Sequence, residues 1–418
     1  MDELAGYGTL GLTVGLVLAR PRYRALEVGP AAAIAVGIAL MASLGLVGYD
    51  EVKRTAGIVW RPLVAVAAIM IMTTAADLLG ALRQVAAVAM ARRGQTATRF
   101  FVGTFVMSAL TAAVLNNDAA ILLLTPLVMT TLPLVYPELP GLRLPFAFAV
   151  FMGAGVAPLV VSNPMNLIVA SYAGIGFNEY LVRMLPVAVA SWAVTLAVLL
   201  AVFRRDLRAA PPVGPRPEPG PWRPSHVHVL ALLGTVMAAY PAVAYAKGPI
   251  WVVAAAGAVL ALGLCRLHLG RRAHSVAAAA IPWQVLLFLA GMLTMAFGLE
   301  NAGIVDRLGR LYDGAGLALV GLVSAVGSAV LNNHPMALIN LLSLEVAEGA
   351  ADALLLAALV GGDLGPRLLP IGSLAGLLWL ELLRRGGLRV PLRRFVSVGA
   401  VVTAPALVAS LAVLSLTA

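Results

Sequence analysis

Two polar triplets lie within otherwise apolar sequence, Asn-Asn-Asp at 116–118 and Asn-Asn-His at 332–334. Adjacent carboxamides offer hydrogen-bond donors and acceptors together, whereas a hydrocarbon environment supplies neither. The amides could also serve only the backbone groups of their own turns. Because the same pair recurs in the same apolar context, we favour a binding site for a small polar ligand.

An apolar segment rich in glycine and proline follows each triplet. Residues 153–166 read Gly-Ala-Gly-Val-Ala-Pro-Leu-Val-Val-Ser-Asn-Pro-Met-Asn, and residues 361–373 read Gly-Gly-Asp-Leu-Gly-Pro-Arg-Leu-Leu-Pro-Ile-Gly-Ser. Proline removes a backbone donor and glycine relaxes a helix, so the spans 145–170 and 351–383 should be broken near mid-membrane. A broken span exposes carbonyls and a half-helix N-terminus that can bind ions or polar groups. Simple proline kinks are the alternative.

These features define two groups of candidate site residues. The substrate-binding candidates are Asn116, Asn117, Ser162, Asn163, Asn166, Asn332, Asn333, Gly372 and Ser373. The proton-coupling candidates are ionisable side chains within apolar segments, namely Asp118, His334, Asp363, Asp77 and Glu300.

Four of the ionisable candidates have simpler interpretations as well. Asp77 and Glu300 lie near span ends and could reach the membrane interface instead. Asp363 could pair with Arg367 across the break, and Asp118 could cap the helix that follows its triplet.

The composition identifies the elements that must position these groups. The chain has 418 residues, of which 61% are hydrophobic and 11% charged, whereas soluble domains are about 25% charged. The apolar runs are too long for the strands of a transmembrane barrel and do not alternate with period two, so we predict an all-α polytopic membrane protein of about ten spans. The predicted spans are 4–19, 28–48, 58–82, 145–170, 180–203, 226–245, 250–267, 280–303, 351–383 and 395–417.

Two further apolar stretches, 98–135 and 315–346, are interrupted midway by Leu-Asn-Asn. We interpret them as re-entrant hairpins, whose non-helical tips are tolerated only inside protein or beside water. Two full spans with an external turn are the alternative.

The chain divides into two similar halves. Residues 108–117 match residues 324–333 at seven of ten positions, and a proline-rich linker at 204–225 separates them. Residues 1–203 and 226–418 each hold five spans and one hairpin, and an odd number of spans inverts the second copy. Inverted repeats with a site at the midplane are typical of secondary transporters.

The net charge of +10 reflects membrane orientation and not nucleic-acid binding. If the N-terminus is outside, the cytoplasmic segments hold 21 Lys and Arg and the external segments hold seven. Positive charge collects in cytoplasmic loops. We therefore predict both termini outside and a cytoplasmic linker.

The single cysteine, Cys265, excludes an internal disulfide and a site of several thiolates. We expect no metal site and no cofactor. An intramembrane enzyme is disfavoured, because no nucleophile and base stand at a readable spacing.

The triplets, the broken spans, residues 371–380 and Gly-Phe-Asn-Glu-Tyr at 176–180 resemble the arsenite/antimonite efflux pumps, the ArsB family. The resemblance implies a bacterial inner-membrane protein that exports trivalent arsenite or antimonite as the neutral hydroxide, driven by the proton motive force. Some members also bind a soluble, arsenite-stimulated ATPase at the cytoplasmic face, so such a partner is an expectation here. The alternative is a sodium-coupled anion carrier or sodium/proton antiporter of the same superfamily.

The predicted orientation can be tested by labelling single cysteines in the linker, at 211–221, after Cys265→Ser. An impermeant thiol reagent should label them in everted vesicles and not in intact cells. Labelling in intact cells would reverse the orientation.

Overall fold

A computed structural model of the protein describes residues 2–19, 22–23, 26–27, 29–90, 96–211, 220–271, 283–347 and 352–417. The centre of the predicted linker, 212–219, lies outside the described residues. Apart from a two-residue antiparallel strand pair, β1 (Arg22–Tyr23) and β2 (Leu26–Glu27), the regular elements are helical.

The described part of the first half contains ten α-helices and two short 3-10 helices. They are α1 (Asp2–Ala19), α2 (Pro30–Ser43), α3 (Tyr49–Leu78), α4 (Ala81–Met90), α5 (Ala97–Val114), α6 (Asn117–Val135), η1 (Pro140–Leu142), α7 (Arg143–Gly153), η2 (Val160–Ser162), α8 (Pro164–Ala173), α9 (Phe177–Val202) and α10 (Arg204–Ala209).

The described part of the second half follows a related order. Its elements are α11 (Pro224–Tyr245), α12 (Ile250–Leu269), α14 (Trp283–Asn301), α15 (Ile304–Tyr312), α16 (Leu317–Leu331), α17 (Asn333–Val346), α18 (Asp352–Leu364), η3 (Gly365–Arg367), η4 (Pro370–Gly372), α19 (Leu374–Arg385) and α20 (Leu392–Thr417).

Eight helices of the described chain are long and apolar enough to cross a membrane: α3, α5, α6, α9, α11, α12, α14 and α20. Shorter apolar helices, α2 and α16 among them, accompany these eight. Apart from the β1–β2 pair, the regular elements of the described chain are helical, and the protein is a multi-pass membrane protein, as the composition predicts.

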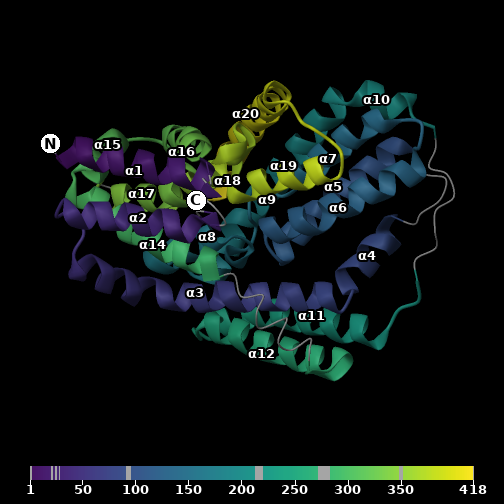
Figure 1. The fold of residues 1–418 in the computed structure, drawn as a ribbon, viewed down its shortest axis with the longest axis horizontal. Coiled ribbons are helices and arrows are strands. Elements are labelled where there is room, and N and C mark those ends of the chain that lie inside the picture. Colours follow the sequence, from purple (N-terminus) through teal and green to yellow (C-terminus); the bar gives the residue numbers. More distant parts are fainter. Residues whose placement is uncertain are drawn as a thin grey trace.

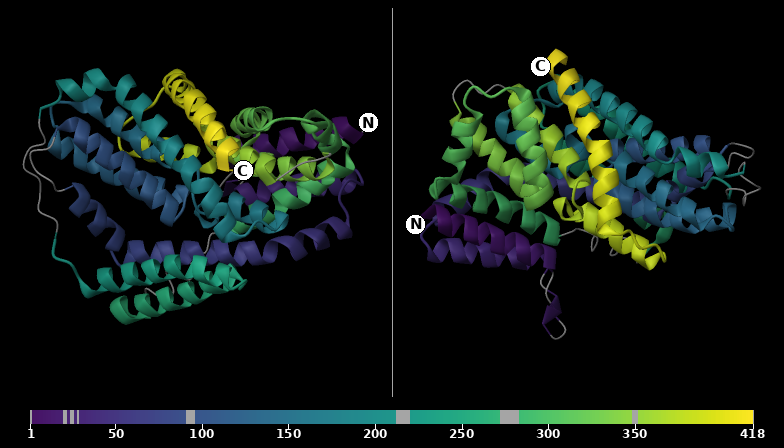
Figure 2. Two further views of the ribbon diagram at one scale, coloured as in Figure 1. Left: turned by 180° about the vertical axis from the view of Figure 1, so that it is seen from behind. Right: turned by 90° about the horizontal axis from the view of Figure 1, so that it is seen from above.

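The helices form two groups at opposite ends of the molecule (Figure 1). At one end lie α5, α6 and α10, beside the start of the linker; we call this end the linker face. At the other end lie α15 and the N-terminus; we call it the distal face. Helix α3 runs along the molecule between them, with α11 and α12 packed against it (Figures 1 and 2).

The two halves make matching contacts. The pair α5–α6 forms the first helical hairpin and packs against α7, and the pair α16–α17 forms the second and packs against α18. Ser108 Oγ donates to Val150 O at 2.6 Å in the first half, and Ser324 Oγ donates to Ala358 O at 2.5 Å in the second. Each serine thus ties a hairpin to the helix that precedes a break.

The predicted breaks are present, but one predicted span is displaced. The expected span 58–82 is the 30-residue helix α3, which starts at Tyr49, and a separate helix, α4, begins after it. The charged residues at 50–54 suggest a loop, yet Glu51 Oε2 accepts a hydrogen bond from Gly48 N at 2.7 Å and starts the helix. Gly80, with φ +78°, separates α3 from α4.

Candidate functional site

Both hairpins turn at an asparagine that caps the following helix. Asn116 Oδ1 accepts from Ala119 N at 2.7 Å, and Asn332 Oδ1 accepts from His334 N at 3.3 Å. Asn332 has φ +84°, a conformation that asparagine tolerates better than most residues. For these two amides the backbone-capping interpretation is correct, and Asn116 rather than Asp118 caps α6.

The second asparagine of each pair is available for other contacts. Asn117 Nδ2 donates to Gly155 O at 3.3 Å, which joins the first tip to the first break. Asn333 is 6% exposed, and its Oδ1 is buried without a hydrogen-bond partner in the described chain. At each tip, the amide oxygen of the first asparagine caps a helix, whereas that of the second asparagine has no hydrogen-bond partner in the described chain.

Each break leads into a helix that starts at a capped residue. After α7 the chain is extended at Ala154, and Asn163 Oδ1 accepts from Met165 N at 3.2 Å before Pro164 begins α8. After α18, Ser373 Oγ accepts from Gly376 N at 2.9 Å to start α19. Side chains of the breaks thus satisfy the helix N-termini.

Asp363, in α18, binds the first break from the second half of the chain. Its carboxylate accepts from Ala157 N at 3.0 Å, from Asn163 Nδ2 at 2.7 Å and from Asn166 Nδ2 at 3.2 Å. The side chain is buried. Three donors from one segment therefore converge on a single carboxylate of another.

Arg367 reaches the same break from η3. Its guanidinium donates to Met152 O at 2.5 Å and to Thr195 Oγ1 at 3.1 Å, instead of pairing directly with Asp363. Gly155 makes room for it, because a Cβ there would collide with Arg367 Nη2. The guanidinium thus neutralises the carbonyl end of α7, where the helix dipole favours a cation.

Tyr180, in α9, completes the first break. Its hydroxyl accepts from Asn166 Nδ2 at 2.8 Å and donates to Ala157 O at 3.2 Å. Asn166 is therefore fixed between a phenol and the carboxylate of Asp363.

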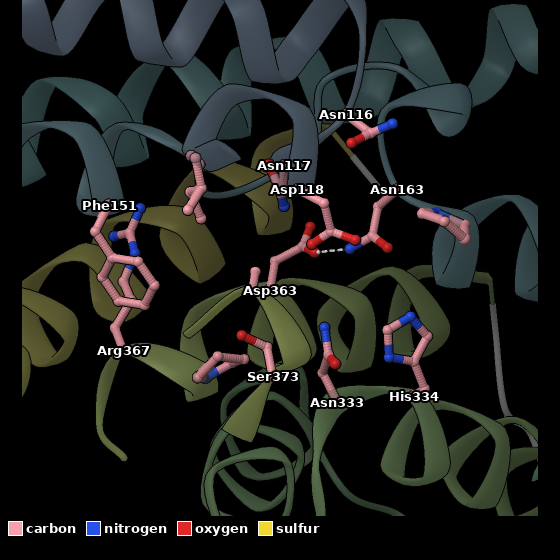
Figure 3. A pocket seen from close by; sticks show the side chains of 15 residues that line it. Asn116, Asn117, Asp118, Phe151, Asn163, Asn333, His334, Asp363, Arg367 and Ser373 are labelled. Carbon is pink, nitrogen blue, oxygen red and sulfur yellow. Dashed lines mark hydrogen bonds between the residues drawn. The ribbon is translucent and has the colours of Figure 1, made fainter. Parts of the chain in front are cut away.

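The hairpin tips and both breaks surround one small cavity of about 40 Å³ (Figure 3). The carboxylates of Asp118 and Asp363 and the amide of Asn163 point toward its centre. Its lining is Asn116, Asn117, Asp118, Ile121, Phe151, Ala154, Asn163, Pro164, Asn333, His334, Asp363, Pro366, Arg367, Ser373 and Ala375.

A larger cavity, of about 500 Å³, opens between α3, α4 and α6 toward the linker face. It is mostly apolar but includes Asp77 and Thr73 of α3. Asn116 and Asp118 line both this vestibule and the central cavity. Asp118, which is partly buried, therefore stands where the two spaces meet.

The remaining sequence candidates lie behind or away from the central cavity. Ser162 Oγ donates to Ala113 O at 2.5 Å, and Asn332 Nδ2 donates to Ile371 O at 3.3 Å. Gly372 approaches Ser328 O so closely that a Cβ would lie 3.0 Å from it. Asp77 faces the vestibule. Glu300 is the penultimate residue of α14, just before α15 of the distal face.

Two residues that hold the first break are not among the candidates that the sequence predicts. The sequence points to Tyr180 only as part of a motif and to Arg367 only as a partner of Asp363, whereas both bind the first break. A buried arginine within an apolar span was the available signal, since such a residue needs partners. For Tyr180 the sequence carries no comparable signal.

Removal of the Asp363 carboxylate should destabilise the protein strongly. Asp363→Ala leaves three buried donors without their acceptor and removes the buried negative charge nearest Arg367, and we expect the free energy of unfolding to fall by about 3–5 kcal/mol. Thermal unfolding in detergent measures this, with the exposed Glu138→Ala as the control, expected to change by about 0.5 kcal/mol or less. Equal unfolding temperatures for the two variants would contradict the assignment.

Comparisons with known proteins agree with this architecture. A family model described as "Arsenical pump membrane protein" matches residues 7–417. Proteins named arsenical pump membrane protein from Yersinia enterocolitica and Escherichia coli are each 31% identical to the chain, covering 96% and 97% of it and 96% of their own length.

Two more distant comparisons extend the similarity. A protein of Mycobacterium tuberculosis described as an uncharacterized transporter is 29% identical over 89% of this chain and 90% of its own length. The crystal structure of the Alcanivorax borkumensis YdaH transporter has a similar fold, with a TM-score of 0.57 at 15% identity over 99% of this chain and 98% of that one.

Proposed function

Because the chain belongs to the arsenical pump membrane protein family, we propose that it exports trivalent arsenite or antimonite as the neutral hydroxide, in exchange for protons. The observation that carries this proposal is the central cavity, where amides and a hydroxyl from two hairpin tips and two helix breaks converge. The structural similarity to a transporter adds support at the level of the fold.

The lining of the central cavity suits a small triol. Such a molecule presents hydroxyl donors and lone-pair acceptors, which match the amides of Asn117 and Asn333 and the hydroxyl of Ser373. A thiolate complex of arsenic would need about three sulfurs, by the multi-thiolate logic of soft-metal sites. Cys265 is buried in α12 and does not line the cavity, so we assign recognition to oxygen and nitrogen groups.

We further propose that the two halves are inverted repeats with re-entrant hairpins, in a bacterial inner membrane with the linker in the cytoplasm. Support comes from the matched serine contacts, Ser108 with Ser324, and from hairpins whose tips meet in one cavity. In this orientation the vestibule faces the cytoplasm. The substrate would then enter past Asp118 and meet the central cavity from the cytoplasmic side.

Proton exchange is assigned to Asp118. Its carboxylate lies between the vestibule and the central cavity, and no described residue donates a hydrogen bond to it. It can therefore take a proton from the vestibule, or lose one, without breaking a fixed contact. His334, which lines the same cavity and packs edge-on against Phe288 with ring centroids 6.1 Å apart, is the second candidate.

The other ionisable candidates are poorer carriers in this structure. The Asp363 carboxylate is held by three donors, so its charge is part of the break. Asp77 pairs with Arg83 at 3.2 Å, and Glu300 pairs with Arg54 at 3.1 Å, both with substantial exposure.

Uptake into everted membrane vesicles tests the function. We expect arsenite to accumulate, to leave when a protonophore is added, and to be indifferent to sodium. Asn333→Ala should raise the half-saturation concentration about 2- to 10-fold, the loss of about one hydrogen bond, whereas Asn178→Ala, whose amide binds Pro241 O, should not. Sodium-dependent uptake would favour the sodium-coupled alternative, and no uptake at normal expression would refute arsenite export.

The coupling role has its own test. Asp118→Asn preserves the shape of the side chain and removes its proton exchange, so we expect proton-driven uptake to fall to the level of protonophore-treated vesicles. Exchange of labelled for unlabelled arsenite should persist. Asp77→Asn is the matched control and should retain proton-driven uptake; if Asp118→Asn also retains it, the role passes to His334.

A further inference from the structure

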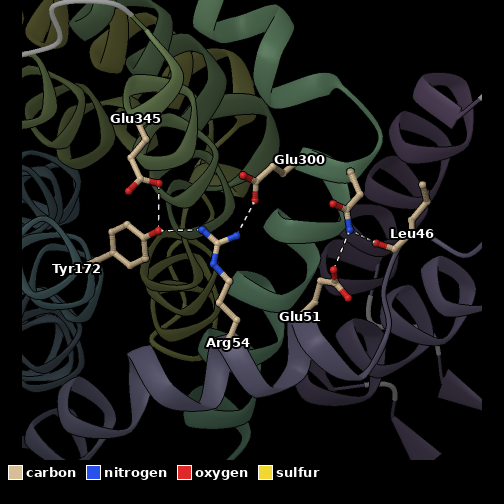
Figure 4. Close-up of polar contacts among 7 residues, drawn as sticks. Leu46, Glu51, Arg54, Tyr172, Glu300 and Glu345 are labelled. Atoms are coloured by element: carbon tan, nitrogen blue, oxygen red, sulfur yellow. Dashed lines mark hydrogen bonds and ion pairs between the residues drawn. The ribbon is translucent and has the colours of Figure 1, made fainter.

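A cluster of four side chains joins four helices near the distal face (Figure 4). Arg54 of α3 donates to Glu300 of α14 at 3.1 Å and to the hydroxyl of Tyr172 of α8 at 3.2 Å. The Tyr172 hydroxyl in turn donates to Glu345 of α17 at 3.0 Å. The Arg54 guanidinium also lies over the Phe297 ring, 4.1 Å from its centroid.

The four helices have different relations to the central cavity. Helix α8 begins at the first break and carries Asn166, and α17 carries Asn333 and His334. Helices α3 and α14 contribute none of the residues that line the central cavity. The cluster therefore ties the elements that line the central cavity to helices that do not line it.

The two faces of the molecule differ in how these helices meet. On the linker side, the vestibule of about 500 Å³ separates α3 from α6. On the distal side, α14 packs directly against α17. The central cavity is thus open toward the linker and closed toward the distal face.

The charged residues follow the same asymmetry. Asp77, near the end of α3, corresponds in sequence to Glu300, near the end of α14. Asp77 pairs with Arg83 of its own half and lines the open vestibule. Glu300 instead takes part in the cluster that reaches across to α8 and α17.

We propose that Arg54, Tyr172, Glu300 and Glu345 form the distal gate of the transporter, which holds the substrate site closed on that face and must open to release the substrate. The inference rests on the proposed transport function. Exposed ion pairs are individually weak, and Arg54 and Glu300 are 45% and 31% exposed, so the gate can break and re-form in each cycle.

Accessibility of a reporter cysteine tests the gate without any transport measurement. Met292 of α14 is buried beside the tip of the second hairpin, eight residues before Glu300, so labelling of Met292→Cys from the distal face, in a Cys265→Ser background, reports opening of the gate. An impermeant maleimide is applied to the face on which the exposed Tyr49→Cys is labelled. We expect slow labelling of Met292→Cys in the otherwise native chain, and labelling at least about threefold faster with Arg54→Ala, the change that loss of one exposed ion pair would produce.

Two further variants separate gating from a loss of folding. Tyr172→Phe keeps the ring and removes only the hydroxyl bonds to Arg54 and Glu345, so it should also accelerate labelling. Arg83→Ala removes the arginine that pairs with Asp77 on the linker side, and it should leave distal labelling unchanged. The thermal unfolding temperature of each variant is measured, and labelling rates are compared only among variants that unfold at the same temperature.

The outcomes distinguish this inference from the proposed function. Faster labelling with Arg54→Ala and Tyr172→Phe, but not with Arg83→Ala, supports the gate even if the vesicles do not accumulate arsenite. Unchanged labelling in both gate variants, with folding intact, overturns the gate even if arsenite transport is normal. Equal acceleration by Arg83→Ala would also overturn it, because the effect would then not belong to the distal cluster.

Discussion

An unwound segment inside a membrane protein must find partners for its backbone within the protein, because lipid offers none. Here that requirement is met by two side chains one helical turn apart. The Asp363 carboxylate accepts a hydrogen bond from the backbone N–H of Ala157, and the Arg367 guanidinium donates one to the backbone carbonyl of Met152. A single short stretch of the second half thus supplies an anion and a cation to the two sides of the break in the first half.

This arrangement explains why the two breaks are not alike. Where the second half has Asp363, the corresponding position of the first half is Gly155, which leaves the space that the Arg367 guanidinium occupies. Among the residues that the structure describes, no charged side chain binds the second break in this way; it is held by the Ser373 cap and by the Asn332 amide on Ile371 O. One break is therefore fixed by charge and the other by neutral groups, although both line the same cavity.

The sequence predicted those features that depend on the residue types of a short segment. Proline and glycine marked both broken helices, and the paired asparagines marked both hairpin turns. Contacts that form only when the backbone and the helices take their places could not be predicted from the sequence. The start of α3 at Tyr49 depends on Glu51 capping Gly48, and the role of Arg367 depends on the space at Gly155. Charged residues that look like a loop, or like a local ion pair, acquire other partners when the helices assemble.

The distribution of hydrogen bonds separates the polar groups that hold the site from those that remain available in it. Asn116 and Asn332 cap helices, and Asp363 is held by three donors, so these groups cannot change partners without loosening the fold. Asp118 has no donor within the described chain, and the Asn333 amide oxygen is buried without one. Because a ligand or a proton must bind to groups that are free to accept it, our proposal assigns proton exchange to Asp118 and counts Asn333 among the ligand-binding groups. The charged side chains of Asp363 and Arg367 hold the first break in place beside these two residues.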